Sequence, residues 1–170
     1  MTHRNFETAM QKGEVGERIV QALLERKGWI VYRPETSGAH CFDMLCIKDK
    51  RIATAFDVKA KSRMNKFPAT GVNQKHFEEY KRFSDRHLME FWIVFVDEGQ
   101  RTIYGNSLQR LEIERVVDGK SYPWVMPVSG GIRLWPLEAM RHIARLDDDS
   151  VRDLTRFNQR SHEYSVVPAT

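Results

Sequence analysis

Two aspartates in apolar surroundings constrain the fold of this chain more than any other feature. Asp43 lies within the apolar run Cys41–Ile47, and Asp57 lies near the end of the run Ile52–Lys59. A carboxylate buried in a strand destabilises a protein unless it is paired, protonated or bound to a cation, so valine or threonine would be the ordinary residue. The pair therefore requires a chemical explanation.

The segment Lys48–Arg51 separates the two runs and predicts a hairpin. If Lys48 pairs with Ile52, Asp43 stands opposite Asp57 and the two carboxylates share one face of the sheet. A slip of one residue would move Asp43 to the other face, because side chains alternate along a strand. We therefore expect the register in which the two aspartates face each other.

Such a pair can bind a divalent metal ion. Opposed strand residues have Cβ atoms about 5 Å apart, so Asp43 and Asp57 could share Mg²⁺ or Mn²⁺ through their oxygen atoms. The main-chain carbonyl of Val58 is a further candidate ligand. Lys59 follows Asp57 by two positions and shares its face. Its ammonium could neutralise a phosphate, orient a water molecule or help to deprotonate it, and the residues alone leave these roles open.

A third carboxylate could come from the first predicted helix, because that helix must cover one face of the sheet. Glu17, or else Glu14, is placed to supply it. An alternative needs no metal: Asp43 and Lys59 form an ion pair while Asp57 caps the sheet edge. This alternative explains each charge singly, but it does not account for a helix glutamate, an acidic pair and a basic stretch in this order.

The hydrophobic periodicity predicts an α/β architecture. The first part of the chain predicts a helix over 13–27 and then three strands, over 29–33, 41–47 and 52–59. A second helix, capped by Asn73, follows. Two more strands are predicted over 91–96 and 101–106. Residues 63–72 predict a loop that could close over a ligand. The last third predicts a helix over 108–117, an extended segment over 122–128, a strand over 132–135, and helices over 136–145 and from 147 to about 160.

The length and composition indicate one domain. At 170 residues we expect a single domain over 1–170, with a core over about 13–106 and a C-terminal extension over about 107–170. No apolar run approaches the roughly 20 residues of a membrane span, and the N-terminus lacks the order of a signal peptide, so we expect a cytoplasmic protein. Cys41 and Cys46 point to opposite sides of one predicted strand and are expected to be small apolar residues rather than a disulfide.

Basic residues follow the acidic pair. The net charge is +4, and the cluster comprises Lys59, Lys61, Arg63, Lys66, Lys75, Lys81 and Arg82. A polyanionic partner such as a nucleic acid would fit this cluster, and a solvated charged face is the alternative explanation.

Three short segments resemble, in the same order, the signature of the PD-(D/E)XK nuclease superfamily. They are Gly13–Glu17, Phe42–Met44 and Asp57–Lys59. The resemblance is closest to the Holliday-junction resolvase-like branch, which has a glutamate on the first helix and a Ser/Gly loop before the first aspartate, here 36–38. That branch usually carries Glu where this chain has Asp57. No proline precedes Asp43, and the C-terminal third matches no element of the family.

The resemblance implies a restriction-endonuclease-like core of helix, three-stranded meander, helix and strand. It implies a mixed sheet flanked by helices, to which this chain adds a C-terminal α+β extension. It also implies a Mg²⁺- or Mn²⁺-dependent phosphodiesterase in which Asp43 and Asp57 bind the metal, Lys59 supports the water molecule, and Glu17 is a direct or indirect ligand. On this basis we expect a homodimer that cleaves branched or duplex DNA. The residues expected to contact DNA are Ser37, Lys61, Arg63, Lys66, Gln74 and Lys75.

Two other functions remain open from the sequence. The chain could be a catalytically inactive nuclease-fold module that binds DNA or protein, in which case it would bind no divalent metal. It could also be a structural protein whose basic face only keeps it solvated, in which case it would bind no nucleic acid even at low salt.

Overall fold

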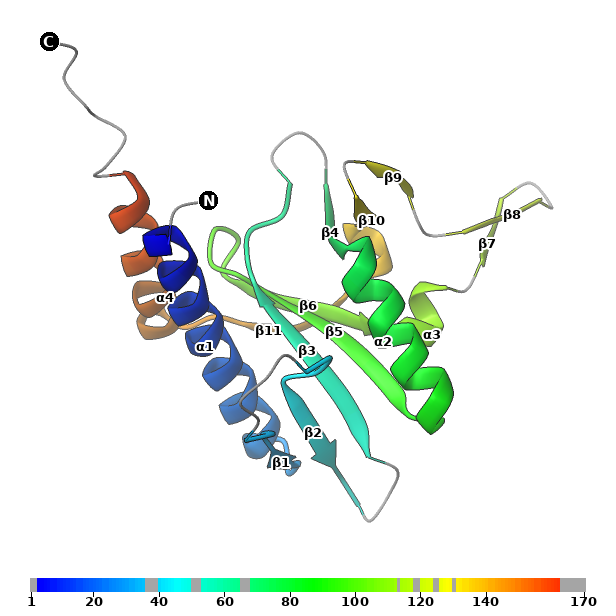
Figure 1. The fold of residues 1–170 in the computed structure, drawn as a ribbon, viewed down its shortest axis with the longest axis horizontal. Coiled ribbons are helices and arrows are strands. Elements are labelled where there is room, and N and C mark those ends of the chain that lie inside the picture. Colours follow the sequence, from blue (N-terminus) through cyan, green and yellow to red (C-terminus); the bar gives the residue numbers. More distant parts are fainter. Residues whose placement is uncertain are drawn as a thin grey trace, which may run out of the picture.

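The computed structural model describes residues 3–35, 40–49, 53–64, 68–112, 114–117, 120–123, 126–129 and 131–162. Within these residues a six-stranded sheet in the order β1-β2-β3-β5-β6-β11 forms the centre of the molecule (Figure 1). Its strands are β1 (Ile30–Tyr32), β2 (Met44–Ile47), β3 (Thr54–Ala60), β5 (Glu90–Asp97), β6 (Thr102–Ser107) and β11 (Arg141–Arg145). Strands β3 and β5 pair in parallel, whereas the pairs on either side of them are antiparallel. The predicted mixed sheet with its three-stranded meander is confirmed.

Helices cover both faces of this sheet. Helix α1 (His3–Arg26) and helix α4 (Asp148–His162) pack over the face that carries Phe56 and Val58. Helix α2 (Gln74–His87) packs over the opposite face, against Ala55 and Ile93. The apolar core therefore has two layers, one on each side of β3 and β5, as the predicted fold class requires.

Local sequence signals set the ends of the first two long helices. Gly28 adopts φ +81°, and its N–H donates to the Glu25 carbonyl over 2.9 Å while the Trp29 N–H reaches the Leu24 carbonyl over 3.0 Å. These two bonds form a glycine stop at the end of α1. Asn73 caps α2, because its Oδ1 accepts the Lys75 N–H over 2.9 Å.

Helix α1 begins at His3, which is ten residues earlier than predicted. Its added turns lie against α4, where Lys12 donates to Asn158 Oδ1 over 3.0 Å. The apolar stripe of the sequence begins only after this part of the helix. Packing against α4 therefore stabilises the first turns of α1, whose sequence has no apolar stripe that would predict a helix.

The C-terminal third departs from the prediction in two places. The helix expected over 108–117 is one turn, α3 (Leu108–Leu111), followed by β7 (Glu114–Val117), which pairs with β8 (Lys120–Pro123). The helix expected over 136–145 is a short 3₁₀ turn, Leu137–Ala139, and then β11. Strand β11 pairs with β6, whose free edge offers hydrogen bonds that a helix at this position would leave unmade.

The loop expected over 63–72 is also partly wrong. Residues Ala69–Asn73 form β4, which pairs with β10 (Ile132–Pro136), and β10 pairs with β9 (Met126–Ser129). Gly71 permits this pairing, because a Cβ on it would lie 2.1 Å from the Arg133 carbonyl oxygen. The extended segment expected over 122–128 is confirmed in its described residues, which belong to β8 and β9, while residues 124–125 lie outside the described part of the chain. The strand over 132–135 and the last helix are confirmed.

The two cysteines do not form a disulfide. Cys46 is buried and Cys41 half-buried, and both are free thiols. In the described part of the chain, no helix combines the length and the apolar character that a bilayer crossing demands.

Gly105 provides a test of how closely the central strands pack. An added Cβ at this position would lie 2.4 Å from the Ile93 carbonyl oxygen, whereas one at Gly13, in α1, meets nothing within 4 Å. We expect Gly105→Ala to lower the free energy of unfolding by about 1–3 kcal/mol. The control Gly13→Ala should raise it by about 0.5–1 kcal/mol. Urea unfolding followed by circular dichroism measures both, and equal midpoints would contradict this packing.

Candidate active site

Strand β3 carries the two central charges on the face covered by α2. Lys59 Nζ lies 2.8 Å from Asp57 Oδ1, and only 4 % of Asp57 is exposed. The two side chains share a face because they are two residues apart on one strand, as predicted. Lys59 therefore pairs with Asp57, and not with Asp43 as the metal-free alternative required.

Asp43 stands immediately before β2, opposite the end of β3. The register of the two strands is Met44↔Phe56, Leu45↔Ala55 and Cys46↔Thr54, which is the predicted one. Continued by one residue, it places Asp43 opposite Asp57. Asp43 Oδ2 accepts the Val58 N–H over 2.7 Å. The Val58 carbonyl points to the same side as its N–H, toward Asp43, because both groups of a strand residue face one neighbour.

Glu17 approaches from the opposite face of the sheet. Gly16 brings α1 close to β3, since a Cβ on Gly16 would lie 2.8 Å from the Ala60 Cβ. Glu17 forms an ion pair with Arg33, beyond the end of β1. Burial and, next, the charge of Asp43 raise the pKa of Glu17, while Arg33 lowers it. Glu17 thus lies within electrostatic reach of Asp43, whereas Glu14 is exposed.

The environment of Asp57 opposes its ionisation. Burial raises the pKa of Asp57 to about 7, although Lys59 acts in the opposite direction. Its Oδ2 atom is buried without a hydrogen-bond partner. Burial alone would lower the pKa of Lys59, but Asp57, Asp43 and Glu17 outweigh it and raise this pKa. Lys59 is therefore held in its charged form.

These residues fit a hard divalent cation in their chemistry. Asp43, Asp57 and the Val58 carbonyl offer oxygen atoms at one end of β3, and the unpartnered Asp57 oxygen lacks the ligand that would offset its burial. In the described residues, no three His, Cys, Asp or Glu side chains converge as a metal site requires. Glu17 in particular pairs with Arg33 instead of joining the two aspartates.

Two residues near the site, Tyr80 and Arg33, were not predicted from the sequence. Tyr80 lies in the apolar core beneath α2, where its ring stacks on Phe91. The Lys59 ammonium, however, lies 6.0 Å from the Tyr80 ring centroid, and burial and the charge of Asp57 raise the pKa of the Tyr80 hydroxyl. Nothing in the sequence around Arg33, which precedes Pro34, predicted its ion pair with Glu17.

The residues expected to contact DNA differ in their surroundings. Ser37 and Lys66 lie outside the described residues. Lys61 is half-buried, its ammonium donates to the Gly71 carbonyl, and burial lowers its pKa. Gln74 donates to Glu78 over 2.9 Å, and Lys75 is exposed at the start of α2.

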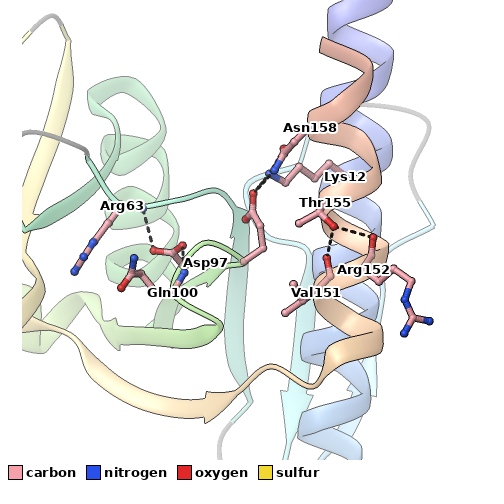
Figure 2. Close-up of polar contacts among 9 residues, drawn as sticks. Lys12, Arg63, Asp97, Gln100, Val151, Arg152, Thr155 and Asn158 are labelled. Carbon is pink, nitrogen blue, oxygen red and sulfur yellow. Dashed lines mark hydrogen bonds and ion pairs between the residues drawn. The ribbon is translucent and has the colours of Figure 1, made fainter. Parts of the chain in front are cut away.

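Arg63 lies in the segment that leaves β3. Its N–H donates to Asp97 Oδ2 over 3.0 Å, and its side chain is directed away from that carboxylate (Figure 2). The backbone of Arg63 is therefore held by Asp97, while its half-buried side chain extends away from that carboxylate.

Comparison with known proteins identifies the fold. Neither models of protein families nor curated protein sequences match the chain. Among solved structures it is similar to Hjc, a Holliday junction resolvase of the archaeal hyperthermophile Archaeoglobus fulgidus, with a TM-score of 0.51 and 16 % identity over 75 % of this chain and 90 % of that chain. The chain has a Holliday-junction-resolvase-like fold. A nuclease from a fusselovirus gives a TM-score of 0.49 and 14 % identity over 92 % of this chain and 97 % of that chain.

The raised pKa of Asp57 predicts a pH dependence of stability. Because folding raises this pKa from 3.8 to about 7, the folded state binds the proton more tightly, and the stabilisation present at low pH is lost as the pH rises through about 7. Between about pH 4 and pH 8 we expect the wild type to lose roughly 1–3 kcal/mol more of its unfolding free energy than Asp57→Asn. Urea unfolding across this range measures the difference.

The control for this prediction is Asp49→Asn, which alters an exposed aspartate. Its pH profile should follow that of the wild type. If Asp57→Asn also follows the wild type, Asp57 is ionised at neutral pH at no cost in stability.

Proposed function

We propose that this protein is a Mg²⁺-dependent endonuclease that hydrolyses phosphodiester bonds of branched or duplex DNA. The observation that carries the proposal is the buried Asp57, which pairs with Lys59, stands opposite Asp43 and keeps one oxygen without a partner. The fold supports it, because the Archaeoglobus fulgidus protein with a similar fold is a Holliday junction resolvase.

Asp43, Asp57 and the Val58 carbonyl would hold the cation, with Glu17 as a direct or indirect contributor. When bound, Mg²⁺ or Mn²⁺ supplies positive charge to the phosphate and lowers the pKa of a water molecule. Lys59 has a raised pKa and stays protonated, which favours neutralising phosphate charge over accepting a proton. Asp57 fixes the direction of the Lys59 ammonium through their 2.8 Å contact.

The basic residues around this centre would hold the DNA backbone. Lys75 is exposed, the half-buried Arg63 directs its side chain away from Asp97, and Lys61 directly follows β3. Contacts of this kind weaken steeply as salt rises, because binding releases counterions. A homodimer would present two such centres and suits a branched substrate with two equivalent strands.

A second function is supported by one observation. In the described residues the carboxylates do not gather as a three-ligand site, and Lys59 already neutralises Asp57. A catalytically inactive module that binds DNA or protein would retain such a pair for stability. Calorimetric titration of Mn²⁺ into the wild type and Asp43→Ala separates the two functions. The enzyme should bind Mn²⁺ and lose this binding in Asp43→Ala, whereas the inactive module should bind no Mn²⁺ in either form.

Substitutions at the central pair test catalysis. Asp57→Asn and Lys59→Ala should each lower the rate of Mg²⁺-dependent DNA cleavage by about 100-fold or more, while leaving DNA affinity largely intact. The control Arg152→Ala alters an exposed side chain that pairs with Asp149 on α4, on the other side of the sheet, and should cleave at the wild-type rate. Undiminished cleavage by either site variant would refute the assignment.

The substrate is tested with end-labelled DNA of several structures. A four-way junction, a flap, a mismatch, a single strand and a plain duplex are incubated with the protein and Mg²⁺ or Mn²⁺, and the cut positions are mapped. Paired symmetric nicks in the four-way junction are the expected result for a resolvase. Cleavage of every duplex without regard to structure would contradict selectivity for branched DNA.

A further inference from the structure

Two adjacent buried carboxylates, Asp97 at the end of β5 (Figure 2) and Glu98 in the turn that follows, have partners on different parts of the molecule. Asp97 is 0 % exposed and Glu98 is 5 % exposed. Buried carboxylates destabilise a protein unless polar groups satisfy them. Their partners therefore indicate what each residue contributes.

Glu98 joins the two helices on the α1 side of the sheet. It pairs with Lys12 of α1 and accepts the Asn158 amide of α4 over 2.9 Å. Lys12 also reaches Asn158 Oδ1 over 3.0 Å, so the three side chains form a closed network. Hydrogen bonds from Asn158 and Lys12 lower the pKa of Glu98, although its burial acts in the opposite direction. Glu98 thus contributes to helix packing.

Asp97 contacts a different segment. Its Oδ1 accepts the Gln100 N–H over 3.1 Å within the turn, and its Oδ2 accepts the Arg63 N–H over 3.0 Å. The second bond joins residues that are 34 positions apart in the chain. It ties the segment that leaves β3, just beyond Lys59, to the end of β5.

Other contacts hold the same segment, Lys61–Met64. The Lys61 ammonium donates to the Gly71 carbonyl, and the Met64 N–H donates to the Ala69 carbonyl over 2.9 Å. Gly99 leaves room for this packing, because a Cβ on it would lie 3.3 Å from Ser62 Oγ. Asp97 supplies the negatively charged member of this set, and it bonds to the backbone of Arg63 and not to its guanidinium.

We propose that Asp97 is a positioning residue that holds Lys61–Met64 so that the Arg63 side chain meets the DNA backbone beside the Asp57–Lys59 centre. The proposal rests on the proposed function, since it assigns a role within DNA binding. A segment that is ordered before binding loses less conformational entropy when it binds, which strengthens the contact. Asp97 bonds to main-chain N–H groups, and the Arg63 side chain is directed away from it.

The adjacent carboxylates provide a matched pair of variants. Asp97→Asn and Glu98→Gln each neutralise one of the two adjacent buried carboxylates, but only the first removes a bond to Lys61–Met64. Binding to a fluorescein-labelled four-way junction and to a plain duplex is measured by anisotropy at several salt concentrations. Asp97→Asn should weaken binding by about 5- to 20-fold and reduce the slope of log affinity against log salt by about one. Glu98→Gln should leave the affinity within about twofold and the slope unchanged.

A double-mutant cycle tests whether Asp97 acts through Arg63. In an Arg63→Gln background, Asp97→Asn should cause little further loss of affinity. A full further loss in that background, or an unchanged salt slope for Asp97→Asn alone, would overturn the proposal. Absence of DNA binding by the wild-type protein would overturn the proposed function as well, so the two failures are distinguishable.

Hydrogen exchange tests the contact itself. The Arg63 amide should exchange at least about tenfold faster in Asp97→Asn than in the wild type, and at the wild-type rate in Glu98→Gln. Urea unfolding establishes that each variant is folded. If Asp97→Asn does not fold, Asp97→Glu keeps the charge but displaces the carboxylate, and the same salt slope and exchange rate decide the outcome.

Discussion

The parallel pairing of β3 with β5 is the constraint on which the rest of the structure depends. Parallel neighbours cannot be joined by a tight turn, so the chain must leave the end of β3, cross the sheet and return to the start of β5. That crossing contains Lys61–Met64, β4 and α2. It places α2 over Asp57 and Lys59, and it leaves the other face to α1 and α4. The site lies where the crossing begins.

The burial that follows from this arrangement gives Asp57 its chemistry. A carboxylate under α2 is shielded from water, so its pKa rises to about 7 and one of its oxygens has no partner. Lys59 offsets part of this cost by ion pairing. Asp43, immediately before β2, lies at the same end of the sheet, because the hairpin register continued by one residue places the two aspartates opposite each other.

Much of this could be predicted, and the failures have physical causes. The register followed from apolar alternation, since a slip would have moved a whole strand to the wrong face. The stretch 136–145 was predicted as a helix, but β6 needed an edge partner, and its hydrogen bonds outweighed a weak local preference. The proximity of Tyr80 to Asp57 and Lys59 was not predicted, because residues so far apart in the chain meet only in the fold.

The sequence by itself determined the hairpin of the two aspartates, the glycine stop of α1 and the asparagine cap of α2. Each depends on alternation or on hydrogen bonds between residues close together in the chain, which local chemistry specifies. Only the tertiary structure decided that β11 completes the main sheet, that Glu17 pairs with Arg33, and that Asp97 holds Arg63. These contacts join distant segments, and they form only when the packing of both core layers brings those segments together.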